Sequence, residues 1–448
     1  MSFNIQKTEK KRVIIVGGGF AGLKLAKRLK NADFEVVLID KNNYHQFLPL
    51  IYQVASAGIE PSSILFPFRK IFQKRAHLFF RLAEVRAIFP EMNMVQTSIG
   101  KASYDYIVFA AGTVTNYFGS KHIEDIAIPM KNVSEAMGLR NALLANYERA
   151  ITCATEKERQ ELLNIVIVGG GATGVEIAGA ISEMKKYILS KDYPEMDNSE
   201  LNIYLIEASD RLLSGLSKKS SESARQFLQE MGVNVWLNER VTGYENYQVT
   251  LESGKAIPTR SFIWVSGVKA VAIGNMQASV IGRGNRIIVD EFNRVKGYSN
   301  IFSIGDQCIQ TTDECYPSGH PQVAQVAIQQ AKQLAENLVN LERSKPLKPF
   351  RYRDLGSMAT IGRNRAVIEM GALRMKGRVA WFTWLVIHLR PIVGLRNKLI
   401  ILLDWFWSYI TYGNSLRFIV YARKTKEIQL REEREAVTHW GEDILGAV

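Results

Sequence analysis

The feature of this sequence that most constrains its fold is a glycine-rich turn that occurs twice, each time between two apolar runs. The first copy spans residues 13–40 and the second spans residues 165–207. The spaced glycines of the two copies are Gly17, Gly19, Gly22, Gly169, Gly171 and Gly174. In each copy a β-branched run leads into the glycines, and a carboxylate ends the next apolar run, Asp40 in the first and Glu207 in the second.

This pattern predicts a β-strand, a glycine turn, the start of a helix and a second strand that ends in an acid. Glycines at this spacing permit the tight turn, the close approach of the backbone to a pyrophosphate and the tight packing of helix on strand. The amides of the helix N-terminus hold the phosphate charge, and the acid binds a ribose hydroxyl. One such turn is weak evidence, but two in full context predict two dinucleotide sites. The simplest such chain is an enzyme that passes electrons between two dinucleotides.

The remaining elements predict an α/β fold in which one Rossmann-like domain is inserted into another. A strand that ends in Ala111 and Gly112 closes the first unit, and residues 262–267 repeat that pattern at the end of the second. A short strand at 300–306 then ends in Asp306, which indicates that the chain returns to the first unit.

The expected domain boundaries follow from that order. The first dinucleotide domain would comprise residues 1–125 and 281–348, with the second domain at 126–280 between them. Residues 349–448 would form a C-terminal region. An amphipathic helix is expected from Gln322 to Glu342, and the alternation of apolar residues over 349–371 predicts strands.

Positive charge is concentrated near the C-terminus. The formal net charge of the chain is +13, and residues 371–426 hold ten Lys and Arg against one acid, Asp404. Four of the seven tryptophans lie in the same region: Trp381, Trp384, Trp405 and Trp407. Basic residues alone would suit nucleic acid or an anionic membrane. Their mixture with tryptophan and leucine indicates the membrane and argues against a nucleic-acid partner.

The two apolar runs of this region, 379–389 and 399–412, are predicted to lie on the membrane without crossing it. A single span would bury the charges of Arg390, Arg396, Lys398 and Asp404. At roughly 2.5–3.5 kcal/mol per central charge, this would cost about 10 kcal/mol or more. Interfacial helices instead bury their apolar side chains and place the basic ones on anionic lipid. The alternative is that the aromatic residues fill a homodimer interface or a soluble core.

The cysteines and the N-terminus bear on the compartment. Cys153, Cys308 and Cys315 are the three cysteines, an odd number that argues against a disulfide framework, and no spacing suggests a metal site. The N-terminus is polar and basic and shows no secretory signal. We therefore expect a peripheral protein on the cytoplasmic face of a bacterial inner membrane.

Four further stretches, together with the glycine turns, carry a resemblance to a known family. They lie at 43–55, 112–118, 323–330 and 384–409. In these stretches the chain resembles the type II (alternative, non-proton-pumping) NADH:quinone oxidoreductases, which belong to the flavoproteins with two dinucleotide-binding domains. The resemblance implies non-covalently bound FAD, NADH as electron donor, a membrane quinone as acceptor and a place at the start of a respiratory chain.

The same resemblance implies roles for individual residues. Those implied for FAD are Gly17, Gly19, Gly22, Asp40, Ala111, Gly112, Asp306 and Ala324. Those implied for NADH are Gly169, Gly171, Gly174, Glu176 and Glu207. Glu176 and Gln325 are the implied catalytic residues, and Gln325 and Gln329 are the implied quinone ligands. Ala331 departs from the pattern, since many members have glycine there, which leaves the shape of the pocket open.

Several of these residues have other interpretations. Glu207 would repel the 2′-phosphate of NADPH, whereas Arg211, four residues later, could weaken that preference. Without the family resemblance, Glu176 would be interpreted as a carboxylate stabilised by a helix dipole. Gln325 and Gln329 lie on one helical face, as a solvent-facing pair also would.

Three alternative functions remain at this point. A sulfide:quinone oxidoreductase-like flavoprotein would use Cys308 and Cys315, although it has no need of a complete second glycine turn. A soluble NADH:disulfide or NADH:ferredoxin reductase should show a closely spaced cysteine pair or lack the amphipathic tail. A redox-dependent protein that binds nucleic acid would not need tryptophan among its basic residues.

Overall fold

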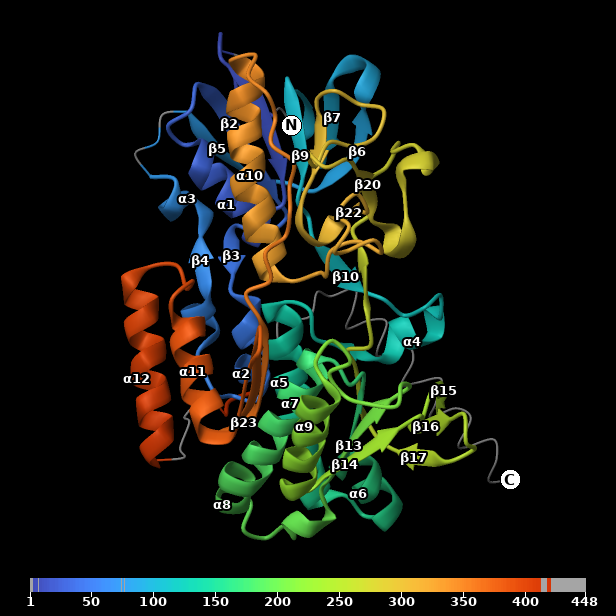
Figure 1. Cartoon of the computed structure of the whole chain (residues 1–448). Helices are drawn as coiled ribbons and strands as arrows, with labels where there is room; N and C mark the ends of the chain where they lie inside the picture. Colours follow the sequence, from blue (N-terminus) through green and yellow to red (C-terminus); the bar gives the residue numbers. More distant parts are fainter. Residues whose placement is uncertain (1–2, 7, 74, 76, 412–416, 420–448) are drawn as a thin grey trace, which may run out of the picture.

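The computed structural model describes residues 3–6, 8–73, 75, 77–411 and 417–419, and it consists of two lobes (Figure 1). The sheet of the first lobe has five parallel strands in the order β21-β9-β1-β2-β5. These strands are β1 (Lys11–Val16), β2 (Phe34–Asp40), β5 (Leu78–Leu82), β9 (Tyr106–Phe109) and β21 (Ile301–Ser303). Residues 13–15 are fully buried, as expected for a parallel sheet covered on both faces.

The second lobe repeats this architecture. Its parallel sheet has the order β11-β18-β12-β13-β14. The strands are β11 (Ile128–Pro129), β12 (Asn164–Val168), β13 (Asn202–Glu207), β14 (Val233–Leu237) and β18 (Ser261–Trp264). Because β21 pairs with β9 of the first sheet, the chain leaves the first lobe, builds the second and returns. The predicted fold class, with one Rossmann-like unit inserted in another, is confirmed.

Long helices cover the sheets. On the first sheet, α1 (Phe20–Leu29) and α10 (Ala324–Glu342) lie side by side (Figure 1). Their buried leucines and alanines share one core with the strands beneath them. The helices of the second lobe are α5 (Val133–Thr152), α6 (Glu156–Leu163), α7 (Ala172–Met184) and α9 (Lys218–Glu230). The helix predicted from Gln322 begins two residues later than predicted, at Ala324.

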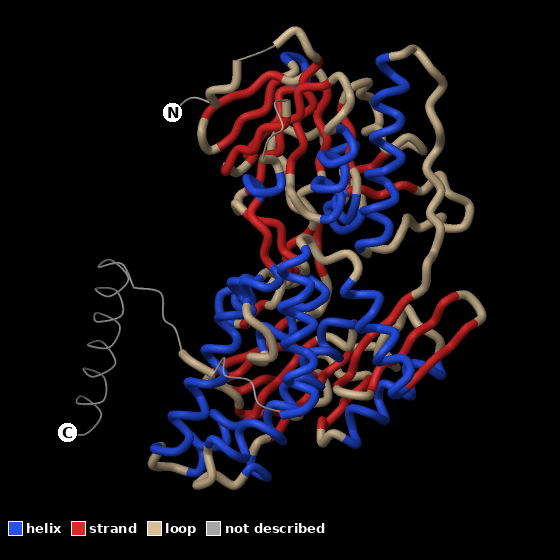
Figure 2. Tube along the Cα trace, turned by 90° about the vertical axis from the view of Figure 1, so that its left-hand side faces the viewer, coloured by secondary structure: helices blue, strands red, loops and turns tan. Residues whose placement is uncertain are grey.

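Two of the chain crossings between the lobes are paired strands. The outgoing strand β10 (Thr113–Thr115) pairs antiparallel with the returning strand β19 (Val268–Ala270). Figure 2 shows strands at the junction of the two lobes. The connection that follows the first dinucleotide unit is thus hydrogen-bonded to the one that follows the second.

Smaller elements complete the fold. The short strands are β3 (Tyr44–Gln46), β4 (Leu65–Pro67), β6 (Val85–Phe89), β7 (Met94–Thr97), β8 (Gly100–Ser103), β15 (Val241–Glu245), β16 (Gln248–Leu251), β17 (Ala256–Pro258), β20 (Ile287–Val289) and β22 (Cys308–Gln310). The short helices are α2 (Ile51–Ala55), α3 (Phe68–Ile71), α4 (Lys121–Ile126) and α8 (Ser190–Asp192).

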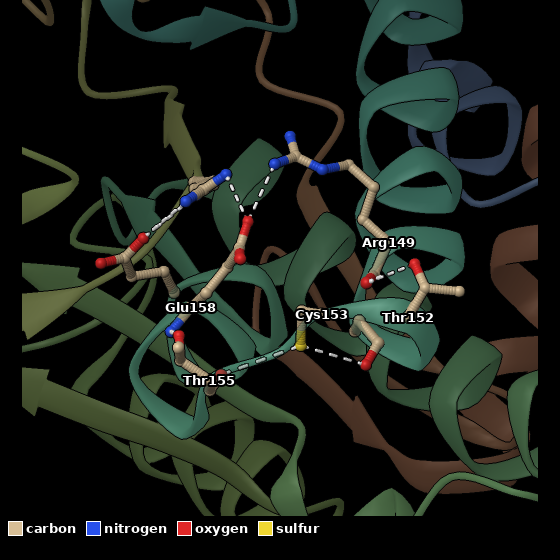
Figure 3. Close-up of polar contacts among 8 residues, drawn as sticks. Arg149, Thr152, Cys153, Thr155 and Glu158 are labelled. Atoms are coloured by element: carbon tan, nitrogen blue, oxygen red, sulfur yellow. Dashed lines mark hydrogen bonds and ion pairs between the residues drawn. The ribbon is translucent and has the colours of Figure 1, made fainter. Parts of the chain in front are cut away.

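Cys153 lies in the turn between α5 and α6 (Figure 3). Its Sγ hydrogen-bonds to the backbone oxygens of Ala150, at 3.3 Å, and Thr155, at 3.9 Å. The Thr155 hydroxyl accepts from the backbone N–H of Glu158 and so caps α6, and the Glu158 carboxylate pairs with Arg149. The thiol of Cys153 is therefore part of a helix-capping turn.

The C-terminal region packs on the second lobe. It contains an antiparallel sheet of β23 (Ser357–Gly362), β24 (Arg365–Met370) and β25 (Leu373–Lys376), then α11 (Gly377–Leu389) and α12 (Leu395–Thr411). The strands predicted over 349–371 begin only at 357, and residues 349–356 form a loop. No neighbouring strand bonds the backbone of this loop: the glutamines of α10 bond residues 353–356, and Phe350 and Tyr352 bond to Glu291, Gln310 and Asp313. Residues 412–416 and 420–448, which include part of the predicted basic region, lie outside the described residues.

The helix pair α11 and α12 is amphipathic. Trp384 is almost fully buried against the body of the protein, whereas a row of apolar side chains on both helices is exposed. We call this row the apolar stripe: Val379, Phe382, Val386, Leu399, Leu402, Leu403, Phe406, Trp407 and Ile410. Among the described residues, no helix is both long and apolar enough to span a bilayer.

Candidate functional site

The first glycine turn connects β1 to α1. Gly17 has φ +99°, and a Cβ there would lie 2.4 Å from the carbonyl oxygen of Ala110. A Cβ on Gly22 would lie 1.8 Å from the oxygen of Gly17, so glycine is needed where helix meets turn. Gly19 instead faces open space, and no side chain caps the N-terminus of α1. The free amides and the open space above them fit a pyrophosphate.

Asp40 lies at the end of β2, beside this turn. Its Oδ2 accepts the backbone N–H of Gly18 at 2.6 Å, and its Oδ1 accepts that of Asn42 at 2.7 Å. Burial raises the pKa of Asp40, and these two amides partly oppose that shift. The carboxylate is thus positioned against the glycine turn, as the ribose assignment requires.

Asp306 lies in the turn Gly305–Gln307, which follows β21 and meets the first glycine turn. A Cβ on Gly305 would be 3.3 Å from the Cβ atoms of both Ala21 and Ala327, so the turn, α1 and α10 converge here. Burial raises the pKa of the Asp306 carboxyl, whereas Lys131 and Arg286 lower it. Ala324, implied for FAD, is the first residue of α10 at the same convergence.

Gln307 connects this turn to Ala111. Its side-chain oxygen accepts the N–H of Ala111 at 2.7 Å, and its Nε2 donates to the oxygen of Val271 at 2.9 Å. Gly112, with φ +70°, accepts the N–H of Val271 at 3.1 Å. The backbone of Ala111 and Gly112 is therefore fixed between the Asp306 turn and the second crossing.

The second glycine turn repeats the geometry of the first. Gly169 has φ +117°, a Cβ on Gly174 would lie 1.8 Å from the oxygen of Gly169, and Gly171 faces open space. Glu207, at the end of β13, accepts the N–H of Gly170 at 2.5 Å. Its other oxygen accepts the N–H and the hydroxyl of Ser209, at 2.8 Å and 2.6 Å.

Arg211 stands apart from the Glu207 carboxylate. Its guanidinium donates to the Ser214 oxygen at 2.9 Å, and no ion pair with Glu207 is present among the described residues.

Glu176 lies on α7 and faces a cavity of about 120 Å³. Burial raises its pKa to about 8, and a hydrogen bond from the Thr360 backbone partly opposes this. The same cavity is lined by Tyr52 of α2 and by Glu183, two turns further along α7, and burial raises the pKa of both. At neutral pH a carboxyl of this kind holds a proton that it can donate.

The far wall of this cavity belongs to the C-terminal helices. Trp381 and Leu385 of α11 and Trp405 of α12 line it. The indole N–H of Trp405 donates to the Gln53 oxygen at 3.0 Å, and Gln53 donates to the Tyr52 hydroxyl at 2.7 Å. The cavity therefore extends from Glu176 to the helices that carry the apolar stripe.

Gln325 and Gln329 lie on one face of α10, as predicted, and hold the loop before β23. Gln325 donates to the Gly356 oxygen at 2.7 Å and accepts the N–H of Leu355 at 3.0 Å. Gln329 makes the same paired contacts with the backbone of Arg353. Each amide nitrogen still has a second N–H for another acceptor. Neither glutamine lines the Glu176 cavity.

Cys308 and Cys315 are both free thiols and differ in their surroundings. Cys308 is buried next to Gln330, and burial raises its pKa to about 11, whereas Cys315 is exposed. A buried thiol that resists ionisation is a poor redox nucleophile.

Several residues of the site were missed from the sequence. Tyr52 and Gln53 fall in a stretch that carries the family resemblance, but nothing in the sequence connects them to α12. Glu183 has a signal, because it lies seven residues after Glu176 on the same helical face. Lys131 and Gln307 carry none, since each acts through a contact far along the chain.

Comparison with known proteins identifies the family. The family model "Pyridine nucleotide-disulphide oxidoreductase" matches residues 11–331, and "NDH2 C-terminal domain" matches residues 355–412. The type II NADH:quinone oxidoreductase NdhA of Mycobacterium tuberculosis is 34% identical, over 95% of this chain and 94% of that protein. The Ndh protein of the same organism is 32% identical over 91% and 89%. This chain belongs to the type II NADH:quinone oxidoreductases.

Solved structures agree with the fold of a type II enzyme. NDH2 from Plasmodium falciparum in complex with NADH aligns with a TM-score of 0.84 at 20% identity, over 91% of this chain and all of that one. The sulfide:quinone oxidoreductase of Aquifex aeolicus aligns with a TM-score of 0.70 at 18% identity, over 93% and 98%. At these identities both likenesses concern the fold alone, and the family match favours the NADH:quinone reaction over the sulfide alternative.

Proposed function

We propose that this type II oxidoreductase passes two electrons from NADH to a membrane quinone through one FAD, with the residue roles set out below. The observation that carries the proposal is the pair of glycine turns. Each turn leaves open space beside a helix N-terminus, and the carboxylate that ends the next strand accepts an N–H from the turn. The relatives match this chain over almost its whole length.

The first lobe is proposed to hold FAD. Gly17, Gly19 and Gly22 allow the pyrophosphate to approach α1, and Asp40 takes the adenosine ribose. Asp306 takes the ribityl chain, with Ala111, Gly112 and Ala324 around the flavin. When bound, FAD accepts the reducing equivalents of NADH and passes them to the quinone.

The second lobe is proposed to hold NADH. Gly169, Gly171 and Gly174 cradle its pyrophosphate, and Glu207 binds the adenine ribose hydroxyls. The carboxylate of Glu207 repels a 2′-phosphate and so favours NADH over NADPH. Arg211 does not cancel that charge, because its guanidinium bonds to the Ser214 oxygen.

Glu176 is proposed to assist placement of the nicotinamide or delivery of a proton, and the two glutamines are proposed to bind the quinone. Reduction of a quinone to a quinol takes up two protons, and a carboxyl whose pKa is about 8 can supply one near neutral pH. Gln325 would use its remaining amide N–H for a quinone carbonyl, with Gln329 beside it. Their contacts with residues 353–356 would keep these amides in place.

The C-terminal helices are proposed to attach the enzyme peripherally to an anionic membrane, on the cytoplasmic face of a bacterial inner membrane. The apolar stripe and the basic residues within 371–426 support this attachment. The same helices could also support a homodimer. The domain boundaries at 125, 280 and 348 belong to this proposal as well.

Anaerobic stopped-flow absorbance of the flavin tests the proposed reaction. NADH should bleach the flavin quickly, and a short-chain quinone should restore it. In Gln325→Ala, bleaching by NADH should be nearly unchanged while reoxidation by quinone slows. Loss of both half-reactions together would contradict the quinone role of Gln325, and a flavin bleached by sulfide but not by NADH would contradict the proposed function.

A further inference from the structure

Each turnover of the proposed reaction takes one proton from the solvent. NADH supplies a hydride and the quinol gains two hydrogens, so NADH, one proton and a quinone give NAD⁺ and a quinol. If Glu176 delivers that proton, its carboxyl must be protonated again before the next turnover. The same cavity is lined by a second carboxyl, Glu183, to which the proposed function gives no role.

Glu176 and Glu183 lie on the same face of α7 and beside the same strand. They are seven residues apart, which places them about 10 Å apart along the helix axis. A hydrogen bond from the backbone of Thr360, in β23, reaches Glu176. The backbone N–H of Arg363, in the turn after β23, donates to Glu183. A Cβ on Gly179 would lie 1.6 Å from a backbone oxygen of β23, so glycine at this position lets the strand approach both carboxyls.

The Glu176 cavity provides a polar connection between the two carboxyls. Burial raises the pKa of Tyr52, and the charges of Glu176 and, more weakly, Glu183 add to that shift, so the Tyr52 hydroxyl is near both acids. Ser56 and Ser408 also line the cavity, whose volume is about 120 Å³. A polar space of this size has room for hydrogen-bonded water between the carboxyls.

Glu183 also lines a second cavity, of about 410 Å³, which we call the outer cavity. Its walls come from the ends of α7 and α9, the turn between β23 and β24, and the first residues of α11. Its lining residues Lys186 and Arg378 are exposed, so the outer cavity reaches the solvent. Among the described residues, those that line both cavities are Glu183, Tyr187 and Arg363. Glu183 is the only carboxyl of these three and therefore stands at the boundary between the two spaces.

The surroundings of Glu183 act on its proton in opposite directions. Burial raises its pKa, whereas the charges of Arg363 and Arg365 lower it. Glu230 lies 3.9 Å from Arg365 and offsets part of that positive charge. The other titratable residues that line the two cavities are Lys186, Tyr187 and Arg378 toward the solvent and Tyr52, Glu176 and Tyr409 on the inner side. A carboxyl under such opposing influences can both take up and release a proton near neutral pH.

We propose that Glu183 returns the proton to Glu176, taking it from the solvent through the outer cavity and passing it along the Tyr52 hydroxyl and the water of the inner cavity. In each turnover the Glu176 O–H bond breaks as its proton goes to a quinone oxygen. The proton of Glu183 then replaces it, and a proton from water in the outer cavity replaces that of Glu183. The electron pair comes from NADH, as in the proposed function, so the relay needs no other reactant. The inference rests on the proposed delivery of a proton by Glu176, through which Glu183 acts.

The test compares two rates in the FAD-loaded full chain at pH 7. The first reoxidation of prereduced flavin by a soluble quinone uses the proton already on Glu176, whereas steady-state NADH oxidation needs that proton replaced in every turnover. In Glu183→Gln the first reoxidation should stay within about twofold of the unaltered chain, while the steady-state rate should drop at least about tenfold. The matched control is Glu230→Gln, which removes a carboxylate from the outer cavity alone and should leave both rates unchanged.

Glu183→Asp distinguishes a proton relay from packing. Aspartate keeps an ionisable carboxyl but lacks one methylene, so it disturbs the packing more than the isosteric glutamine does. A relay predicts a faster steady state in Glu183→Asp than in Glu183→Gln, and packing predicts the reverse order. If Glu183→Gln failed to retain FAD, kcat of Glu183→Asp should decline with rising pH from a lower pH than in the unaltered chain, because aspartate holds its proton less firmly. An equal loss at every pH would contradict the relay.

Three other outcomes would overturn the inference. An unchanged steady-state rate in Glu183→Gln would mean that protons reach Glu176 by another route. Loss of the first reoxidation together with the steady state would mean that Glu183 shapes the cavity, and an equal loss in Glu230→Gln would mean that the charge of the outer cavity matters instead. Failure of the proposed function is distinct from these, because quinone would then not reoxidise the flavin of the unaltered chain, or Glu176→Gln would be reoxidised at the unaltered rate.

Discussion

At the scale of single residues, Glu207 combines a structural and a selective role, and a substitution can separate them. Its carboxylate accepts N–H groups from Gly170 and Ser209 and would meet the ribose of NADH. We expect Glu207→Arg to raise the ratio of kcat/KM for NADPH over NADH at least roughly tenfold, about 1.4 kcal/mol, since repulsion becomes attraction. Glu207→Gln, which keeps an acceptor, should give a smaller change. Unchanged selectivity in Glu207→Arg would rule out the ribose assignment.

Glu176 should give quinone reduction a characteristic pH dependence. Burial raises the pKa of its carboxyl to about 8, so the protonated form declines as pH rises through that value. The rate of flavin reoxidation by a soluble quinone should decline over the same range. In Glu176→Gln this rate should be lower at pH 7 but flat up to pH 9, because an amide does not titrate. A variant that kept the slope would exclude Glu176 as its source.

The same shift predicts a change in stability. The ordinary pKa of a glutamate is 4.5, so as pH rises from there the unfolded chain releases the Glu176 proton while the folded chain keeps it. Unfolding therefore becomes easier up to about pH 8 and changes no further above it. Glu176→Gln lacks this penalty, so its Tm relative to the unaltered chain should rise between pH 5 and pH 8. A Tm difference independent of pH would contradict the raised pKa.

At the scale of elements, neighbouring glycines of one turn have different roles. A Cβ on Gly174 would lie 1.8 Å from the Gly169 oxygen, whereas a Cβ on Gly171 meets nothing within 4 Å. Gly174→Ala should therefore destabilise the protein by about 3 kcal/mol, seen as a lower Tm. Gly171→Ala should leave Tm unchanged but weaken the binding of NADH, because its methyl group would occupy the space of the pyrophosphate. Equal effects of the two variants on Tm would show that the packing is not the constraint.

These turns were also what the sequence predicted best, because a strand, a glycine turn and a helix are local and their spacing is fixed by the backbone. The helix at 324–342 and the amphipathic pair at 377–411 were likewise predictable from periodicity. The loop at 349–356 was not. Phe350 and Tyr352 alternate as in a strand, but their backbones bond to Glu291, Gln310 and Asp313. The backbone of residues 353–356 bonds to Gln325 and Gln329. Contacts with distant parts of the chain decided the outcome, and alternation cannot reveal them.

At the scale of the whole molecule, what the sequence could not predict is which distant segments share a cavity. Glu176, Tyr52 and Trp405 come from three helices of three separate chain regions and line one space. Their meeting depends on the packing of the C-terminal region on the second lobe, which leaves no periodic signal. The consequence is functional, because the cavity links the buried carboxyl of Glu176 to the helices that carry the apolar stripe.

The orientation of the whole molecule on a membrane can be tested at the stripe. Leu403 is 64% exposed on α12, and Leu82, on the first lobe, is 50% exposed. If the stripe inserts, Leu403→Glu loses roughly 1.5–3 kcal/mol of apolar burial, so binding to anionic vesicles should weaken about tenfold or more in a flotation assay. Leu82→Glu introduces the same charge away from the proposed membrane face and should weaken binding far less. Because Leu403 does not line the Glu176 cavity, NADH oxidation with a soluble quinone should continue in both variants. If both variants stayed bound alike, the stripe would instead be a surface for another protein or a second copy of the chain.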